Sequence, residues 1–239
     1  MSKTLNAIKK TVIYLLGLLI IALGIGLSNK SNLGISPVSS IPKVLSTKFD
    51  SFSLGNMVII VYCLLVVAQL IVLRKKFKLK NILGVPVALI FGIMVDFVGI
   101  KEYKLTIAGI IDLGIEKKFS GLLMFLPTPT NYVFKLIYLL ISIVVIGIGV
   151  YIYLYPNLVP MPAEGLAGAI SEVSEKPFGN CKTYVDVGLI LIALILQVIL
   201  LGGLNSFIGD KVVVREGTIL SAICVGQVVK FLKRKFSKN

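Results

Sequence analysis

The sequence is dominated by long runs of apolar residues that contain no charged side chain. Residues 11–29 and 51–73 are two such runs, and each is long enough to cross the hydrocarbon of a bilayer, which takes a helix of about 20 residues. Apolar residues make up 56% of the chain, and the mean hydropathy is +0.96. Because a soluble core of this size could not bury so much apolar surface, the sequence predicts an integral membrane protein.

Six segments fit membrane-spanning helices, so we expect an all-α membrane protein with about six transmembrane helices. They cover residues 11–28, a part of 51–73, 82–100, 134–155, 184–201 and 212–231. The first is expected to be a retained helix rather than a signal peptide, because no small-residue cleavage site follows it. Residues 101–130 are mixed, and their apolar pieces at 105–111 and 119–126 are too short to cross. An interfacial segment, a re-entrant segment and an extra pair of crossings remain open there.

The net charge of +14 is concentrated beside the apolar runs. Residues 1–10, 74–80 and 230–239 together hold thirteen Lys and Arg residues and no acid. This distribution is typical of membrane proteins whose basic flanks stay in the cytoplasm, and it argues against nucleic-acid binding. We expect a multi-pass protein of a cytoplasmic membrane with both termini cytoplasmic. The lipid bilayer, with anionic head groups at that face, is the expected partner.

An internal repeat relates the two halves of the chain. Residues 32–37 (Asn-Leu-Gly-Ile-Ser-Pro) align with residues 157–162 (Asn-Leu-Val-Pro-Met-Pro), with three of six positions identical at an offset of 125. Further matches follow in the same order: Gly24 with Gly149, Gly55-Asn56 with Gly179-Asn180, and Gly92, Val95 and Phe97 with Gly226, Val229 and Phe231. The repeat predicts two three-helix units at residues 11–100 and 134–235, joined by an insert at 101–133.

The odd number of helices in each unit determines how the units are related. A unit of three crossings ends on the opposite side of the membrane from its start, so the second unit must enter from the other side. Such inverted repeats are common among secondary transporters, whose binding site lies at the interface between repeats. The sequence therefore predicts two inverted three-helix repeats.

Three motifs in this chain resemble a known family. Leu33-Gly34-Ile35-Ser36-Pro37, the later Gly55-Asn56, and Met161-Pro162-Ala163-Glu164-Gly165 are similar to the YczE/YyaS/YitT family of bacterial membrane proteins. The resemblance covers about residues 10–235, without the insert at 101–130. It implies a polytopic protein of the bacterial cytoplasmic membrane and supplies no established substrate. The family often has an acid after the Gly-x-x-Pro of the first repeat, where this chain has Ser39, which argues against a role needing two symmetric carboxylates.

Two proline residues are expected to start short helices after the first helix of each repeat. Ser36-Pro37 and Met161-Pro162 fit an N-cap followed by the first helical residue, with helices over 37–45 and 162–173. A helix start exposes unpaired N–H groups and a partial positive charge. The two starts either face one cavity and bind an anion or carboxylate, or belong to surface helices that close loops.

Eight polar residues near these elements are candidates for binding a small molecule. Glu164 either complements the helix dipole or binds a proton, a cation or an ammonium group. Capping is the alternative for Asn56, Asn180 and Asp186, and hydrogen bonding between helices is the alternative for Gln197 and Gln227. Asp96 is expected to be an interfacial residue at a helix end. The candidate set is Asn32, Ser36, Ser39, Asn56, Asn157, Glu164, Asn180 and Gln227.

No enzyme signature is present, and the chain has no histidine, so Ser/His catalysis is excluded. We expect no catalytic residue, no metal site and no cofactor. The leading hypothesis is a secondary transporter or exporter of a small polar or anionic metabolite, with its site between the inverted repeats. The alternative is a non-transporting membrane factor that assists or organises a partner protein. A polar cavity lined by Ser36, Ser39, Asn56, Glu164 and Asn180 would favour transport, and a dry interface between the repeats would not.

Overall fold

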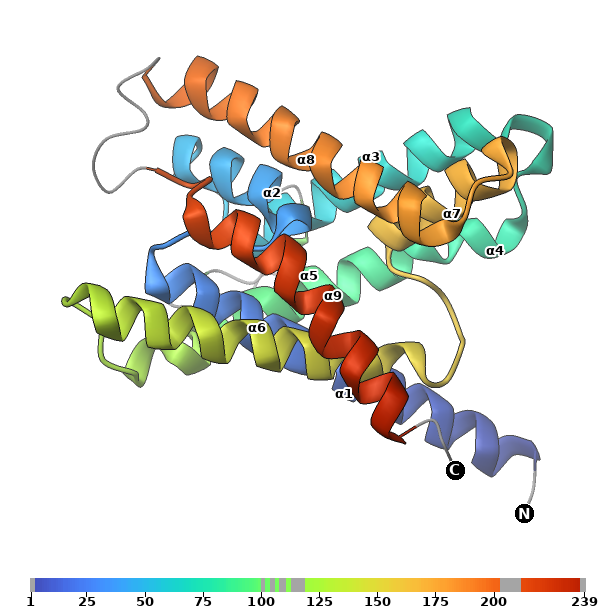
Figure 1. Ribbon diagram of the computed structural model, residues 1–239, viewed down its shortest axis with the longest axis horizontal. Coiled ribbons are helices and arrows are strands. Elements are labelled where there is room, and N and C mark those ends of the chain that lie inside the picture. Colours follow the sequence, from blue (N-terminus) through green and yellow to red (C-terminus); the bar gives the residue numbers. More distant parts are fainter. Residues whose placement is uncertain are drawn as a thin grey trace.

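The computed structural model describes residues 3–99, 102–103, 106–107, 111–112, 119–202 and 212–236, and this part of the chain is almost entirely helical (Figure 1). The first half contains α1 (Lys3–Ser31), α2 (Pro37–Lys48), α3 (Leu54–Leu73), the 3-10 turn η1 (Arg74–Lys76), α4 (Leu79–Ile82) and α5 (Gly84–Val98). The second half contains α6 (Tyr132–Leu154), α7 (Pro162–Ser174), α8 (Phe178–Leu201) and α9 (Glu216–Phe236).

Five helical stretches in the described part are long and apolar enough to cross a membrane. They are Thr4–Ser31, Leu54–Lys76, Leu79–Val98, Tyr132–Leu154 and Phe178–Leu201. The predicted sixth crossing at about 212–231 forms α9, which is not among the five. The last turn of α9 carries Lys233, Arg234 and Lys235, and basic residues lower the mean hydropathy of a segment. A multi-pass membrane protein is thus supported, while the number of six stays a prediction.

Both short helices begin at their proline, as the sequence predicts. Pro37 and Pro162 occupy the first turns of α2 and α7, each after a residue in an extended conformation. The chain turns before each of them at an asparagine with positive φ, 52° at Asn32 and 50° at Asn157. Asparagine tolerates this left-handed conformation better than most residues, so the same local chemistry redirects the chain after α1 and after α6.

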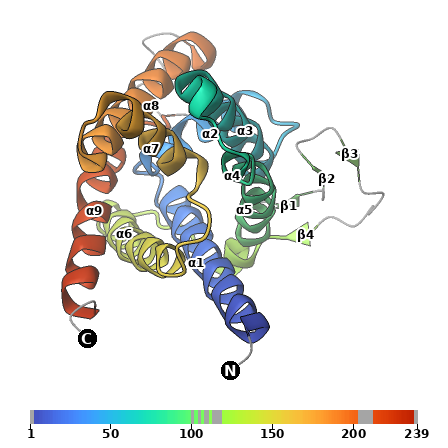
Figure 2. The same ribbon diagram turned by 90° about the vertical axis from the view of Figure 1, so that its right-hand side faces the viewer.

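The insert between the halves has short extended pieces and one 3-10 turn where it is described. Antiparallel pairs join β1 (Glu102–Tyr103) to β4 (Phe119–Ser120) and β2 (Thr106–Ile107) to β3 (Ile111–Asp112), and η2 (Leu122–Phe125) follows. Figure 2 shows these strands beside α5, outside the helix bundle. The possible extra pair of crossings involves residues that lie partly outside the described ones.

The centre of the molecule is the long contact between α1 and α6, where glycines allow the two backbones to approach closely. A side chain at Gly24 would collide with Ile146, and a side chain at Gly149 would collide with Ile21. Gly17 lies in the same way against Tyr153. A shift of 125 residues relates Gly24 to Gly149 and Ile21 to Ile146. Equivalent residues of α1 and α6 therefore make the first two contacts.

The short helices pack across the two halves. Helix α2 lies against α8 and α3, and α7 lies against α3 and α8. Outside this layer, α5 packs along α3 and α1, and α9 packs along α6. Viewed from one end, α3 and α5 therefore form one flank of the bundle and α8 and α9 the other (Figure 2).

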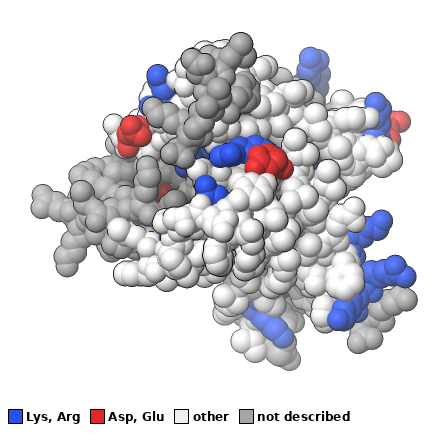
Figure 3. All heavy atoms as spheres, turned by 60° about the vertical axis from the view of Figure 1, so that its left-hand side comes forward, with Lys and Arg blue, Asp and Glu red and all other residues white. Residues whose placement is uncertain are grey.

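The two ends of the bundle differ in charge. Both chain termini and the connection from α3 through η1 to α4 lie at the same end (Figure 1), so the basic stretches of residues 3–10, 74–80 and 230–236 share that end. Helix α7 lies toward this end and α2 toward the opposite one. The view in Figure 3 brings the opposite end forward, and its described atoms are mainly uncharged apart from one group of basic and acidic atoms near the centre. This arrangement is consistent with the predicted even number of crossings.

Candidate functional site

The start of α7 gathers three charged side chains from two helices. The Glu164 carboxylate, in the first turn of α7, lies 3.7 Å from the Lys182 ammonium of α8 (Oε1 to Nζ). Lys182 also donates a 2.6 Å hydrogen bond to Oδ1 of Asp186, one turn further along α8. The exposed fractions of the Glu164, Lys182 and Asp186 side chains are 18%, 24% and 20%. We call these three residues the Glu164 cluster; it holds two carboxylates and one ammonium.

Helix α3 holds the start of α7 in place. The Gln69 side-chain amide donates a 3.0 Å hydrogen bond to the carbonyl oxygen of Pro162. Gly165 lies directly over the same amide, and a Cβ there would come within 2.8 Å of Oε1 of Gln69. Ala163 and Ala167 are fully buried on the packed side of α7. Small residues therefore allow α7 to lie close to α3, and this packing fixes the position of Glu164.

Three tyrosines from three other helices lie within electrostatic range of Glu164. Tyr14 of α1 and Tyr153 of α6 pack edge to face with ring centroids 5.9 Å apart, and Tyr62 of α3 stacks on Phe91 of α5 at 5.7 Å. The Glu164 carboxylate interacts electrostatically with all three tyrosine hydroxyls. The Tyr14 hydroxyl donates a 2.9 Å hydrogen bond to the carbonyl oxygen of Val159. Both halves of the chain thus contribute tyrosine hydroxyls that interact electrostatically with Glu164.

Two polar atoms of this region have unused hydrogen-bonding capacity. Oε2 of Glu164 and the hydroxyl of Tyr153 are buried. Oε2 has no hydrogen-bond partner within the described part of the chain, and the only polar contact of the Tyr153 oxygen there is one with the backbone of Met161 that falls short of full hydrogen-bond geometry. Tyr153 is 1% exposed and lies beside the backbone of Met161. Most buried polar groups in folded proteins are paired, so the unpaired carboxylate oxygen of Glu164, in electrostatic range of the incompletely paired Tyr153 hydroxyl, marks a candidate binding site.

The start of α2 is built without charged side chains. The Ser36 hydroxyl donates to the Ser39 hydroxyl at 3.2 Å, and the Ser40 hydroxyl donates to the carbonyl oxygen of Pro37 at 2.6 Å. The backbone N–H of Ile35 donates to the hydroxyl of Thr218 at the start of α9, at 3.2 Å. Ser39 stands at the position that Glu164 has in the second half, 125 residues later. This helix start is neutral, whereas its counterpart is charged.

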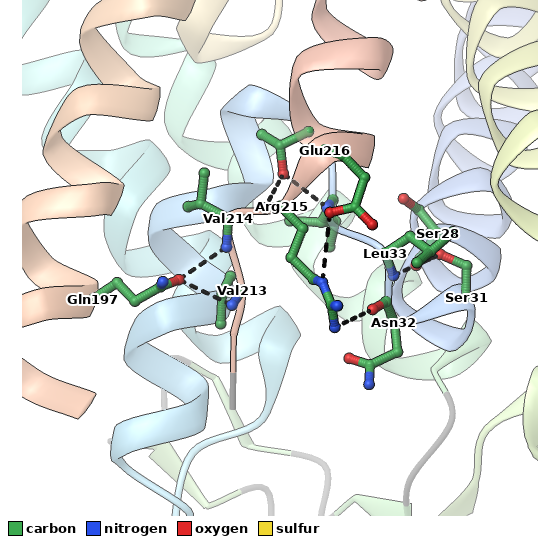
Figure 4. Close-up of polar contacts among 11 residues, drawn as sticks. Ser28, Ser31, Asn32, Leu33, Gln197, Val213, Val214, Arg215 and Glu216 are labelled. Atoms are coloured by element: carbon green, nitrogen blue, oxygen red, sulfur yellow. Dashed lines mark hydrogen bonds and ion pairs between the residues drawn. The ribbon is translucent and has the colours of Figure 1, made fainter. Parts of the chain in front are cut away.

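Hydrogen bonds tie the chain before α9 to α8 and to the turn that precedes α2 (Figure 4). Oε1 of Gln197 accepts hydrogen bonds from the backbone N–H groups of Val213 and Val214, each 2.9 Å long. The Arg215 guanidinium donates to the carbonyl oxygen of Asn32 at 3.1 Å, and the same Arg215 pairs with Glu216 at 3.7 Å. Gln197 was expected to hydrogen-bond between helices; in the structure, its oxygen holds the segment that leads into α9.

The candidate residues from the sequence do not form a single site. Asn32, Ser36 and Ser39 lie at the start of α2, and no hydrogen bond or ion pair joins Ser36 or Ser39 to Glu164 among the described residues. Asn56 is buried in the first turn of α3. Asn157, Asn180 and Gln227 are exposed on the surface. A shallow pocket, lined in part by Ser28, Asn32 and Lys43, lies near α2 rather than near α7.

The structure changes the interpretation of two acidic residues, Asp186 and Asp96. Asp186 does not cap α8, because that helix already begins at Phe178 and Asp186 lies in its third turn, paired with Lys182; the capping interpretation is wrong. Asp96 accepts hydrogen bonds from the Ser53 hydroxyl and from the backbone N–H of Gly55, the latter 2.7 Å long. This carboxylate of α5 therefore completes the N-terminus of α3 and is more than an interfacial end residue.

The sequence did not predict that Lys182, Asp186 and three tyrosines interact with Glu164. Lys182 and Asp186 have the i, i+4 spacing of a helical ion pair, which was an available signal. Tyr14, Tyr62 and Tyr153 have no local signal, because they reach the cluster only through the packing of α1, α3 and α6 around α7.

Comparison with known proteins gives a family but no function. No curated protein and no solved structure matches the chain. The sequence matches the family described as "Family of unknown function (DUF6198)" over residues 8–234. The narrower resemblance to the YczE/YyaS/YitT family stays a prediction. The match extends from α1 to the last turn of α9 and includes every element of the candidate site, so the chain belongs to the DUF6198 family.

Proposed function

We propose that this protein is a secondary transporter or exporter of a small polar metabolite, which binds at the start of α7 between two inverted three-helix repeats. The observation that carries the proposal is the Glu164 cluster, an ion-pair group among apolar helices with one carboxylate oxygen unpartnered. Ionisable residues within membrane-spanning bundles are costly and are mostly found where they serve function.

The inverted repeat in this proposal is supported by reciprocal contacts. Gly24 meets Ile146 and Gly149 meets Ile21, as expected of equivalent elements packed about a local twofold axis. The backbone carbonyls beside these glycines, of Ser142 and Gly17, are also related by the offset of 125. At the level of helices, α2 lies on α8 while its counterpart α7 lies on α3. A binding site where α7 of one half meets α3 of the other is typical of transporters with inverted repeats.

The charge at the two helix starts bears on the substrate. A free helix start favours an anion, so the two helix starts in the sequence predict an anionic metabolite. At α7, however, Glu164 already supplies the negative charge to the first turn. At α2, the first turn has no acid, so an anionic substrate would be expected there. The proposal therefore keeps a polar metabolite in general, and a transport experiment must include both charge classes.

Transport in proteoliposomes tests the proposal. Purified protein would be given a panel of labelled amines, amino acids, carboxylates and sugars, with and without a pH gradient. We expect saturable uptake of at least one class and its loss in Glu164→Gln. Glu172→Gln is the matched control, because Glu172 lies on the same helix with an exposed side chain. Equal uptake in Glu164→Gln and the unmodified protein would overturn the site, and no saturable uptake of any class would overturn transport.

The orientation belongs to the same proposal. Because the three basic stretches share one end of the bundle (Figure 1), we place both termini and the α3–α4 connection in the cytoplasm, next to anionic lipid head groups. Tags at the two termini should be protected from protease in intact cells and cleaved after permeabilisation. Cleavage of either tag in intact cells would contradict this orientation.

A partner-binding role is the second candidate, and it has an observation of its own. Among the described residues, Gly179 and Gly188 of α8 and Gly226 of α9 have no neighbour within 4 Å of the position of a Cβ. Glycine faces allow close approach of another helix in a membrane. Bulky substitutions such as Gly188→Leu would block a helix of a partner protein but leave proteoliposome transport unchanged. A defect in cells with normal transport in liposomes would favour the partner role.

A further inference from the structure

The Glu164 cluster has an unbalanced charge. Among the described residues, the titratable or charged groups that interact with the cluster are Lys182 and Asp186 of α8 and the hydroxyls of three tyrosines. These tyrosines are Tyr14 of α1, Tyr62 of α3 and Tyr153 of α6. With both carboxylates ionised, the single ammonium leaves one negative charge, which the partial positive charge at the start of α7 offsets only in part. An unpaired charge in a mostly buried place is costly, so the cluster favours one further positive group.

The geometry shows where that positive group would bind. Oε1 of Glu164 faces the Lys182 ammonium, whereas Oε2 of the same carboxylate is buried and unpartnered. The Tyr153 hydroxyl is buried, interacts electrostatically with Glu164, and has only the backbone of Met161 as a polar contact among the described residues. A ligand with N–H donors and a positive charge would satisfy both oxygens with charge-assisted hydrogen bonds.

The surroundings also suit a small organic cation. The rings of Tyr14 and Tyr153 pack edge to face in this region, and aromatic faces attract ammonium groups. Gly168 lies one turn after Glu164 on the same face of α7 and has no neighbour within 4 Å of the position of a Cβ. Among the described residues, no side chain therefore occupies the space at Gly168 on this face of α7.

We propose that the Glu164 cluster binds a small protonated amine, whose N–H groups donate to Oε2 of Glu164 and to the hydroxyl of Tyr153. This inference rests on the proposed function and deepens it, because it names primary or secondary ammonium compounds as the substrate class. Lys182 acts in this scheme as the tethered cation that neutralises the other carboxylate oxygen. The competing explanation is that a proton alone neutralises Glu164.

A binding experiment with matched probes separates these explanations. The thermal unfolding of purified protein in detergent would be followed at pH 7 against n-butylammonium, n-butyrate and butan-1-ol, which share one alkyl chain and differ in charge. A ligand that binds only the folded protein raises the melting temperature by mass action. We expect a saturable rise with n-butylammonium alone. In Glu164→Gln the dissociation constant should rise about 10- to 100-fold, the loss of one charge-assisted hydrogen bond.

Two further variants keep the inference falsifiable if Glu164→Gln does not fold. Tyr153→Phe removes one acceptor from the ammonium and should weaken binding of n-butylammonium about three- to tenfold, as expected for one neutral hydrogen bond. The exposed Glu172→Gln should bind as the unmodified protein does. Equal shifts with butan-1-ol, or unchanged binding in Glu164→Gln and Tyr153→Phe, would overturn the amine site. So would a stability that depends on pH through Glu164 without any response to the amine, which identifies a proton site.

The transport experiment separates this inference from the function on which it rests. Glu164-dependent uptake of carboxylates or sugars, with no binding of n-butylammonium, would overturn the amine class and leave the transporter. Saturable n-butylammonium binding without flux of any panel member would leave the amine site and overturn transport.

Discussion

The two halves of this protein follow the same order of helices and turns but use them differently. In the first half, α5 closes tightly on α3, where Gly55 and Gly92 lie in contact and Asp96 accepts hydrogen bonds from the start of α3. In the second half, the corresponding Gly179 and Gly226 face open space. The charged groups gather instead at the start of α7. The first half is therefore closely packed, and the second half carries most of the candidate chemistry.

The difference shows that a repeated backbone does not determine which side chains stand at its equivalent positions. Positions related by the repeat offset of 124–125 residues hold Ser39 in one half and Glu164 in the other, and Tyr62 in one and Asp186 in the other. Tyr62 nevertheless interacts electrostatically with both Glu164 and Asp186, because α7 packs on α3 as well as on α8. The site is thus asymmetric in chemistry although both halves contribute to it.

The largest expected effect concerns the two Gly-Asn motifs that start α3 and α8. In Gly55→Ala, the new Cβ would collide with the carbonyl of Gly92 and the carboxylate of Asp96, and overpacking of this kind costs on the order of 3 kcal/mol. Gly179→Ala meets no atom within 4 Å and should change stability little. Unfolding of the two variants in a detergent series measures the difference. Equal losses would contradict the contrast between the halves.

The next effect compares the two buried glutamines. In Gln197→Leu, the backbone N–H groups of Val213 and Val214 lose their acceptor, at a cost of about 2–3 kcal/mol. In Gln69→Leu, only the carbonyl oxygen of Pro162 loses its donor, and we expect about 1 kcal/mol. The same unfolding measurement applies to both. A larger loss in Gln69→Leu would mean that the hydrogen bond to α7 contributes more stability than the two hydrogen bonds to the segment before α9.

A smaller difference is expected at the repeat-related pair of Asp96 and Lys230. Asp96→Ala removes two hydrogen bonds at the start of α3 and should cost about 1–2 kcal/mol, as for the loss of a helix cap. Lys230 is exposed on α9, so Lys230→Ala should stay within about 0.5 kcal/mol. Thermal unfolding of both variants at equal detergent concentration tests this. A neutral Asp96→Ala would show that water replaces the carboxylate at the helix start.

The smallest effect lies within the Glu164 cluster itself. A double-mutant cycle of Glu164→Gln and Lys182→Met measures the coupling across the 3.7 Å ion pair. Because both side chains keep some exposure, we expect about 0.5–1 kcal/mol, in the range of partly screened pairs. The corresponding cycle with Asp186→Asn should give a larger coupling, since its contact with Lys182 is a 2.6 Å hydrogen bond. A larger coupling energy with Glu164 than with Asp186 would show that Lys182 pairs mainly with Glu164.

Local sequence signals predicted much of the backbone. The predicted helices agree with the structure within a few residues at most ends, and α2 and α7 begin at Pro37 and Pro162 because proline is pre-organised for the first helical turn. The first helix extends further than expected, from Lys3, since its polar first turns are exposed and need no apolar partner. Candidate residues were less well predicted, because exposed Asn157, Asn180 and Gln227 have the same local pattern as buried ones.

The sequence by itself determined that this protein belongs in a bilayer, where its helices begin and where its chain turns. Apolar run length specifies a bilayer, and proline and asparagine specify where a helix begins or the chain reverses. Only the tertiary structure decided which polar side chains meet. Glu164 acquires Lys182, Tyr14, Tyr62 and Tyr153 as neighbours through contacts among five helices. Such contacts depend on the packing of residues far apart in sequence, and no local pattern encodes that packing.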